Sequence, residues 1–311
     1  MSGFTIAVHG GAGRLNRDNL SEARQEDIRA GLAEALRAGG DILEQGGTAT
    51  DAVIAAVVVL EDDPAFNAGR GAVLNRDGRA EMDASIMEGT GRRAGAVGAV
   101  RGVRNPIQLA RAVMEQTQHV LLAAEGAHAL AQRLALPMAP MDYFITPLRR
   151  DQWLAVRGRE NSFLDHDVKG TVGAVARDRA GRLAAATSTG GMTNKMPGRI
   201  GDSALIGAGT WAWDKTCAVS ATGHGERFIR VSCAARLSAL IELAGMDLGP
   251  AARQLVHEEL LELDARGGLI AVGADGRWSM PYNDGGMLRG VRTEAEPARV
   301  GIWDELAAWP A

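Results

Sequence analysis

The chain has 311 residues, 46% of them hydrophobic and 23% charged, a composition typical of folded globular proteins rather than disordered or fibrous ones. A net charge of −4 argues against a dedicated nucleic-acid-binding protein, and no apolar run reaches the roughly 20 residues of a transmembrane helix. The N-terminal residues do not resemble a secretory signal, and two cysteines, Cys217 and Cys233, exclude a disulfide scaffold. We therefore expect a cytoplasmic protein that has neither a membrane nor a nucleic acid as its partner.

The spacing of apolar residues predicts the helices. Leu, Ile and Ala recur at helical intervals over six stretches, which are about 21–45, Thr50 or Asp51 to Leu60, 106–117, 121–135, 227–244 and 250–264. Ser21 can cap the first helix, and Pro106 suits the first turn of the third, where its missing N–H costs little. The second stretch is almost wholly apolar, which predicts a buried helix.

The strands are predicted mainly as hairpins. The apolar run FTIAVH at 4–9 predicts a buried strand that leads into a glycine loop, HGGAG. Turn residues at 77–78, 180–181 and 275–276 lie between apolar runs and predict three hairpins. Residues 137–170 are rich in proline and charge and are predicted to be a linker, after which TVGAVARD begins a strand at Thr171. Blocks of helices and blocks of hairpins favour antiparallel sheets covered by helices.

Glycine and hydroxyl residues carry the chemical signal. Glycine makes up 40 of the 311 residues, well above the usual share of about 7%. The GxSxG, P-loop, HExxH and CxxC signatures are missing, and the six histidines are scattered without metal-ligand spacing. Hydroxyl and glycine residues gather instead at Gly170-Thr171, in ATSTGG at 186–191 and in TGHGE at 222–226.

A threonine hydroxyl needs a base before it can act as a nucleophile. No Ser/His/Asp arrangement is visible, so one remaining base is the threonine's own α-amine, whose ordinary pKa is about 7.7 to 8.0. That solution requires a cut in the chain before the threonine, and the predicted linker ahead of Thr171 is where such a cut could occur. Taken alone, Gly170-Thr171 is better explained as the plain start of a strand, because threonine favours strands.

Several ordered motifs together resemble one family. KGTVGAVARD, AATSTGGMTNKMPGRIGDS and SATGHGE, together with AVHGGAG and LEDDPAFNAGRGAVLNRDGRAEMDASIM at 60–87, are similar to the plant-type L-asparaginases and isoaspartyl peptidases of the N-terminal nucleophile (Ntn) hydrolases. The resemblance covers nearly the whole chain. It implies a single domain over 1–311 with an α/β (α+β) fold, namely a four-layer αββα sandwich in which helices cover two facing, mainly antiparallel sheets.

The resemblance also implies self-cleavage between Gly170 and Thr171, which would give an α subunit of residues 1–170 and a β subunit of 171–311. Thr171 would be the nucleophile, and its freed amine would be the base. Thr189 would hydrogen-bond and orient the nucleophile. Thr222 and Gly223 would form the oxyanion hole, where one donor can be worth about 3 kcal/mol.

Further residues are carried over by their match to the motifs. Arg199 and Asp202, in PGRIGDS, would bind the α-carboxylate and α-ammonium of the substrate, the arginine through a two-pronged bond. From local sequence alone the same pair is better explained as a solvated charged turn. Asn67 would support the active site, and the His9-Gly10-Gly11 segment would pack near the nucleophile and help to place it for self-cleavage. His224 is assigned no catalytic role.

A structural sodium ion is also implied, and no cofactor is expected for catalysis. The loop that would bind the ion offers backbone carbonyl oxygens, for which the candidates are Leu60, Glu61, Asp63, Phe66, Ala68 and Arg70. Backbone ligands leave little signature in the side chains, so this expectation depends on the motif match.

The leading hypothesis is an autoprocessed amidohydrolase that acts on L-asparagine and on β-aspartyl (isoaspartyl) dipeptides through a covalent acyl-enzyme. The resemblance implies a dimer of cleaved αβ units. Two alternatives stay open. One is a transferase that binds a nucleotide through the glycine-rich HGGAG and GRG segments, and the other is a glycosylasparaginase, against which the missing signal peptide and cysteine framework count.

Overall fold

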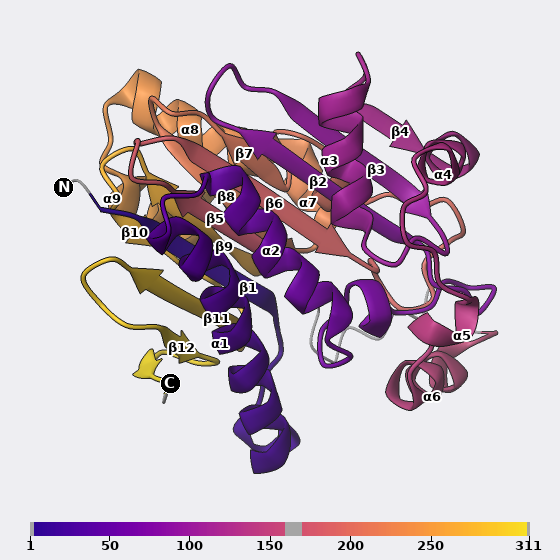
Figure 1. Ribbon diagram of the computed structural model, residues 1–311. Coiled ribbons are helices and arrows are strands. Elements are labelled where there is room, and N and C mark those ends of the chain that lie inside the picture. Colours follow the sequence, from indigo (N-terminus) through magenta and orange to yellow (C-terminus); the bar gives the residue numbers. More distant parts are fainter. Residues whose placement is uncertain (1–2, 159–169, 310–311) are drawn as a thin grey trace.

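The computed structural model describes residues 3–158 and 170–309. Two sheets face each other, and helices cover their outer faces (Figure 1). The larger sheet contains β1 (Thr5–Gly13), β2 (Met82–Glu88), β3 (Ala94–Val100), β4 (Leu121–Ala123), β5 (Val172–Arg177), β6 (Leu183–Thr189), β11 (Gly286–Thr293), β12 (Arg299–Gly301) and β13 (Ala307–Ala308). The smaller sheet contains β7 (Thr210–Ala212), β8 (Cys217–Gly223), β9 (Gly267–Gly273) and β10 (Trp278–Ser279).

The strand order of the larger sheet mixes distant parts of the chain. The order is β13-β12-β11-β1-β5-β6-β2-β3-β4, and that of the smaller sheet is β10-β9-β8-β7. Among the described strands, β3 and β4 pair in parallel, while the other paired strands are antiparallel. This is the αββα sandwich with mainly antiparallel sheets that the resemblance implies.

The helices are α1 (Glu22–Glu44), α2 (Ala49–Asp62), α3 (Pro106–Gln116), α4 (Ala124–Arg133), α5 (Met141–Phe144), α6 (Pro147–Val156), α7 (Gly225–Val231), α8 (Cys233–Ala244), α9 (Leu248–Gln254) and α10 (Leu260–Glu262). Helices α1, α2 and α3 pack on the larger sheet, and α8 and α9 pack on the smaller one. No helix in the described ranges is both long enough and apolar enough to cross a bilayer.

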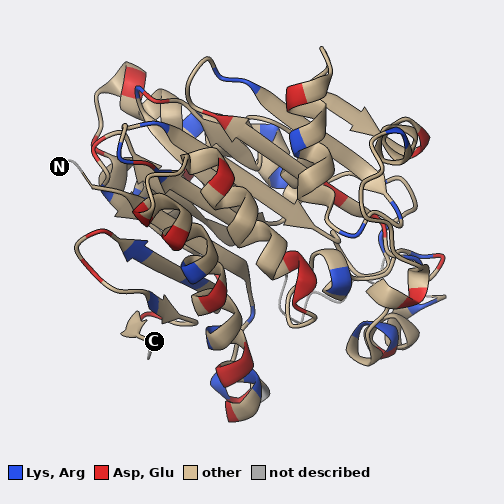
Figure 2. Cartoon of the chain, in the orientation of Figure 1, with Lys and Arg blue, Asp and Glu red and all other residues tan. Residues whose placement is uncertain are grey.

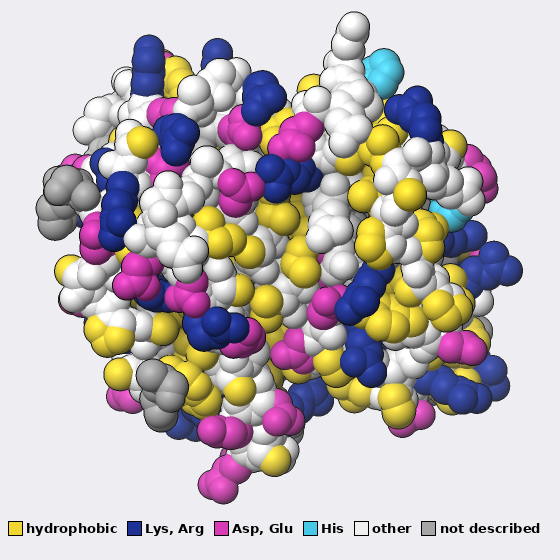
Figure 3. Space-filling model, in the orientation of Figure 1, with side chains coloured by type: hydrophobic (Ala, Val, Ile, Leu, Met, Phe, Trp, Pro, Cys, Tyr) yellow, Lys and Arg dark blue, Asp and Glu magenta, His cyan; other side chains and the backbone are white. Residues whose placement is uncertain are grey.

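The core has three layers of apolar contact. The helices that cover the larger sheet bury Leu and Val against it, and α8 and α9 form a second cluster with the smaller sheet. Between the sheets lies a third cluster that is rich in alanine. Small side chains let the two sheets approach closely, and facing sheets normally pack about 10 Å apart. Figure 2 shows charged residues mostly on helices, loops and strand ends, and the face in Figure 3 intersperses basic and acidic side chains.

Most predicted helix starts are confirmed. Ser21 Oγ accepts a hydrogen bond from Arg24 N and so caps α1, and Pro106 is the first residue of α3. Helix α2 begins at Ala49, slightly earlier than predicted, because Thr48 caps it by accepting from Asp51 N. The β5–β6 and β9–β10 hairpins turn where the sequence predicts them.

Four predictions need correction. HGGAG continues β1 as far as Gly13, because β11 pairs with it beyond a bulge between His9 and Gly11. Residues 121–123 form the edge strand β4 before α4 begins. The predicted helix 227–244 is broken at Ser232, whose φ of 50° is left-handed. The predicted hairpin at 77–78 contains only the isolated bridge Leu74↔Ala80.

The predicted linker 137–170 is partly helical. Helices α5 and α6 occupy 141–156, and α6 starts at Pro147 with Thr146 as its cap. Phe144 and Arg149 are buried, and Arg149 Nε donates to Gly71 O. Such docking could not be recognised from apolar periodicity. Residues 159–169 of the predicted linker lie outside the described ranges.

Candidate functional site

Three neighbouring strands in the interior of the larger sheet bring the predicted nucleophile to one end of these strands. Val172 on β5 pairs with Ser188 on β6, so Thr171 and Thr189 come next along the same ladder. Asp83 at the start of β2 pairs with Thr189. The sheet register thus places residues from three separate motifs side by side.

The two threonines are in direct contact. Thr171 Oγ1 donates to Thr189 Oγ1 over 3.2 Å, and Thr189 Oγ1 also accepts from Gly191 N at 2.9 Å. Thr171 keeps 9% of its surface exposed, whereas Thr189 is buried at 2%. A buried oxygen that is already held by a backbone N–H is a fixed reference point, so Thr189 restrains the rotamer of the Thr171 hydroxyl.

Asn67 ties the cleavage site to the loop that follows β6. Its Oδ1 accepts from Val73 N and its Nδ2 donates to Gly191 O, both at 2.8 Å. A Cβ at Gly170 would lie only 2.9 Å from Asn67 Cβ. Asn67 thus packs directly against the residue that precedes Thr171, and its supporting role stays a prediction.

Thr222, the next-to-last residue of β8, has a buried hydroxyl that lacks a partner among the described residues. Its side chain is fully buried, and Oγ1 has no hydrogen-bond partner among the described residues. A buried polar group without a partner costs about 1–3 kcal/mol, so an oxygen that can be satisfied by a ligand fits this position. Gly223 follows with a φ of 159°, in a conformation that brings its backbone against Arg266 O and the Phe228 ring.

Arg199 and Asp202 lie close together beside the start of α7. A Cβ at Gly225 would lie 2.8 Å from both Arg199 Nη2 and Asp202 Oδ1. Asp202 Oδ2 is buried and has no partner among the described residues. Burial raises the pKa of Asp202 to about 7, against the attraction of the Arg199 guanidinium. An ammonium ion placed at Oδ2 would satisfy this carboxylate.

Glu226 is a partner of Arg199 that the sequence did not identify. Arg199 Nε and Nη2 donate to its two carboxylate oxygens, each at 2.9 Å. Although burial raises the pKa of Glu226, the hydrogen bonds from Arg199 outweigh this effect and hold it below its ordinary value. The signal lay in TGHGE, but the two residues are 27 positions apart, so only the fold reveals the pair.

Buried charges hold the loop between Gly190 and Asp202. Lys195 is 1% exposed, and its Nζ donates to Glu81 O at 2.8 Å, while burial lowers the pKa of its ammonium. Asp83 accepts from Ala99 N and from Gly201 N. These contacts fix both ends of the segment that carries Arg199.

His9 packs under the nucleophile. Its Nε2 lies 2.9 Å from Ser220 Oγ, and Gly10 O lies 3.5 Å from a Cβ placed at Gly170. Burial lowers the pKa of His9 to about 3, and the nearby backbone of Thr171 opposes this shift. The imidazole is therefore neutral. Because HGGAG is part of β1 rather than a loop before a helix, it does not have the geometry of a phosphate-binding loop.

The loop after α2 suits a hard cation held by backbone oxygens. Leu60 and Glu61 belong to the last turn of α2, where helical carbonyls lack partners within the helix. Gly69 and Gly71 fold back so that their backbones pack against Glu61 O and Phe66 O. Among the described residues no cluster of three His, Cys, Asp or Glu side chains could bind a metal. The donors that this loop offers are backbone carbonyl oxygens, which hard cations prefer, and the sodium site stays a prediction.

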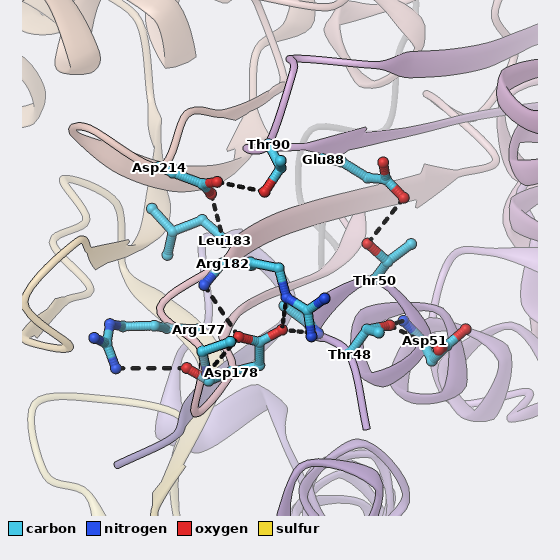
Figure 4. Close-up of polar contacts among 12 residues, drawn as sticks. Thr48, Thr50, Asp51, Glu88, Thr90, Arg177, Asp178, Arg182, Leu183 and Asp214 are labelled. Carbon is cyan, nitrogen blue, oxygen red and sulfur yellow. Dashed lines mark hydrogen bonds and ion pairs between the residues drawn. The ribbon is translucent and has the colours of Figure 1, made fainter. Parts of the chain in front are cut away.

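A second polar cluster lies at the opposite end of β5 and β6 (Figure 4). Asp178 accepts from Arg182 Nε and from Ala49 N, the first N–H of α2. Asp214 accepts from Thr90 Oγ1 and Leu183 N. Asp178, Arg182, Thr90 and Leu183 border a surface cavity of about 350 Å³. Since the charged groups labelled in Figure 4 all have partners, this cluster is explained by its structural contacts.

The sequence of the whole chain decides the family. A family model described as asparaginase matches residues 2–302. The chain belongs to the asparaginase family. The isoaspartyl peptidase of Salmonella typhimurium is 45% identical over 98% of this chain and 100% of its own length. That of Escherichia coli is 44% identical over 98% of both chains, and the mouse isoaspartyl peptidase/L-asparaginase is 44% identical over 91% of this chain and 86% of its own.

Membership of the asparaginase family agrees with the αββα sandwich, and it makes this protein a hydrolase. The residues that the motifs singled out gather at one end of the sandwich, around Thr171 and around the Arg199–Asp202 loop. Their individual chemical roles stay predictions.

Proposed function

We propose that this hydrolase cleaves the side-chain amide of L-asparagine and the isopeptide bond of β-aspartyl dipeptides, with Thr171 as the nucleophile. The observation that supports this most directly is the contact of Thr171 Oγ1 with a buried, fixed Thr189 Oγ1 at 3.2 Å. The names of the relatives, isoaspartyl peptidase and L-asparaginase, agree with this substrate class.

The reaction follows from the positions of the polar groups. Cleavage between Gly170 and Thr171 frees the α-amine of Thr171, which takes the proton of its own hydroxyl. Oγ1 then attacks the amide carbon, and the negative charge that develops on the carbonyl oxygen is stabilised by Thr222 Oγ1 and the Gly223 N–H. The amine passes its proton to the leaving ammonia or amino acid, and water hydrolyses the aspartyl ester.

Substrate binding uses the charged pair beside α7. In the proposed complex Arg199 binds the α-carboxylate and the free Oδ2 of Asp202 accepts from the α-ammonium. The unpartnered state of this buried oxygen supports the assignment, because leaving it without a partner costs free energy that a bound ammonium recovers.

Mass spectrometry of the intact protein tests the nucleophile and the cleavage together. We expect wild type to appear as two fragments that separate before Thr171 and to release ammonia from asparagine. The Thr171→Ala variant should stay in one piece and be inactive, with an unchanged circular dichroism spectrum as the control for folding. A full-length, uncut wild type with full activity would overturn the proposal.

Three further expectations belong to the same proposal. The cleaved molecule would assemble as a dimer of αβ units, a structural sodium ion would bind the loop after α2, and catalysis would need no cofactor. We place the enzyme in the cytoplasm, where the free, buried thiols of Cys217 and Cys233 are stable.

A further inference from the structure

Beneath the predicted catalytic residues lies a second row of aligned polar residues. His9 pairs with Gly173, Gly173 with Thr187, and Thr187 with Ser85, so these four residues cross β1, β5, β6 and β2 in one line. Thr187 lies two residues before Thr189, and Gly173 two residues after Thr171. Because side chains alternate along a strand, the two rows share one face of the sheet.

The facing sheet completes this row with two hydroxyls. Ser220 on β8 and Thr210 on β7 pair with each other. Ser220 Oγ lies 2.9 Å from His9 Nε2 and 2.7 Å from Thr187 Oγ1. Thr210 Oγ1 lies 2.5 Å from Thr187 Oγ1 and 2.7 Å from Ser85 Oγ. We call Ser85, Thr187, Thr210 and Ser220 the inter-sheet hydroxyl row.

The row ends at the substrate-binding loop. Ser85 Oγ donates to Ser203 O at 2.6 Å, and Ser203 is the neighbour of Asp202 in the chain. One unbroken series of hydrogen-bonded groups therefore joins His9, which packs below Thr171, to the segment that carries Asp202.

Gly173 creates the space for this connection. A Cβ at this position would overlap Ser220 Oγ and lie 2.5 Å from His9 Nε2. Only glycine in β5 lets the hydroxyl from the opposite sheet reach across to both His9 and Thr187. The missing side chain at Gly173 thus leaves the space that the Ser220 hydroxyl occupies.

Burying these polar side chains between the two sheets costs free energy that packing alone would not require. His9 and all four hydroxyl residues are fully buried, in a layer whose main cluster is apolar. Apolar residues of similar shape could fill such a layer without any need for hydrogen bonds. A satisfied polar network, by contrast, fixes one relative placement of the elements that it joins.

We propose that the inter-sheet hydroxyl row is a positioning network that sets the spacing between the Thr171 nucleophile and the Asp202 end of the substrate site. This inference rests on the proposed function. Substrate held by Arg199 and Asp202 meets Thr171 at the correct distance only while the row locks the two sheets and the 202–204 segment in register. A shift of about 1 Å in such a geometry can cost roughly 100-fold in rate.

Thr187 is the residue to test, because it contacts both hydroxyls of the smaller sheet. Thr187→Val removes the hydroxyl at nearly constant shape, and Thr187→Ser keeps it. We expect Thr187→Val to lower kcat about tenfold or more with little change in KM, since binding is kept while alignment is lost. Thr187→Ser should stay within about twofold of wild type.

A matched control disrupts another pair of buried, hydrogen-bonded hydroxyls by removing one of them. Thr216 Oγ1 and Ser238 Oγ lie 2.7 Å apart, and both side chains are buried, but this pair is not part of the row. Ser238→Ala should lower the unfolding temperature to an extent similar to Thr187→Val and leave kcat unchanged. If the two variants lose stability alike and both keep kcat, the row is merely structural and the inference is wrong.

A second variant keeps the test decisive if Thr187→Val does not fold. Ser220→Ala breaks the row from the opposite sheet and should reproduce the loss of kcat. In the double variant the two losses should be less than additive, because both remove the same connection; full additivity would contradict a shared network. All rates are divided by the amount of cleaved protein, in which Thr171 is an N-terminus. If wild type produces no such N-terminus, the proposed function is refuted, and not only the inference about the row.

Discussion

Asp202 illustrates how burial can prepare a single side chain for one ligand. Its Oδ2 is buried without a partner, and burial raises its pKa to about 7. Near neutral pH the free enzyme therefore contains both the protonated and the ionised carboxyl, and only the ionised form can accept from a substrate ammonium.

The proposed role of Asp202 predicts a pH dependence. As pH falls through about 7, Asp202 takes up a proton, loses its attraction for the α-ammonium, and kcat/KM for asparagine should fall. Asp202→Asn should lower kcat/KM at least tenfold near pH 8, since an ionic hydrogen bond is lost. It should remove the part of the acidic limb that belongs to Asp202 and leave the part that comes from protonation of the Thr171 α-amine.

Succinamic acid, which is asparagine without its α-amine, provides the control. For this substrate kcat/KM should not fall as Asp202 takes up a proton, because the substrate has no ammonium to bind this carboxylate. A wild-type profile with the same acidic limb for both substrates would assign the titration to another group.

Individual residues show which parts of the candidate site can be predicted from the sequence and which cannot. Thr171, Thr189 and Asp202 stand within recognisable motifs, so the sequence alone singles them out as candidates. Glu226 was missed because its pairing with Arg199 depends on where α7 begins, and Ser220 was missed because its contact with His9 crosses from one sheet to the other. Contacts of this kind exist only after the register of several strands is set.

At the scale of elements, local signals explain helix starts better than strand ends. Ser21 and Pro106 mark helix starts through their own chemistry, so α1 and α3 were predicted closely. The extension of β1 through HGGAG depends on its partner β11, and the break between α7 and α8 at Ser232 has no local signal, because serine rarely adopts a left-handed conformation.

The predicted sodium site lies at the end of α2 and in the loop that follows it. If its last carbonyls and the following loop bind sodium, the ion stabilises the folded state by mass action. Replacing sodium chloride with N-methylglucamine chloride at equal ionic strength should lower the unfolding temperature by a few degrees, given about 2–4 °C per kcal/mol for domains of this size. Equal unfolding temperatures in the two salts, measured by calorimetry, would rule out a stabilising sodium site.

At the scale of the whole molecule, the two predicted fragments share one sheet. Residues 1–170 contribute β1 to β4, and residues 171–311 contribute β5, β6 and β11 to β13. In the order β13-β12-β11-β1-β5-β6-β2-β3-β4, strands of the two fragments meet at three places, and β1 lies with a strand of the other fragment on each side.

This arrangement predicts that cleavage does not release the fragments. After cleavage wild type should elute from a sizing column as one species that contains both fragments, and denaturing gels should show two bands. Thr171→Ala should elute at the same volume as a single band. Two separate peaks under native conditions would contradict the strand order.

This strand order implies that folding comes before the proposed cleavage. The continuous polypeptide must fold first, since β1 has to enter between strands of the later half before any cut is made. Once divided, an unfolded copy would have to rebuild its sheet from two independent chains, at a rate that falls with dilution. If the chain is cleaved as proposed, unfolding is therefore hard to reverse, and the lifetime of each active copy depends on how rarely its shared sheet opens.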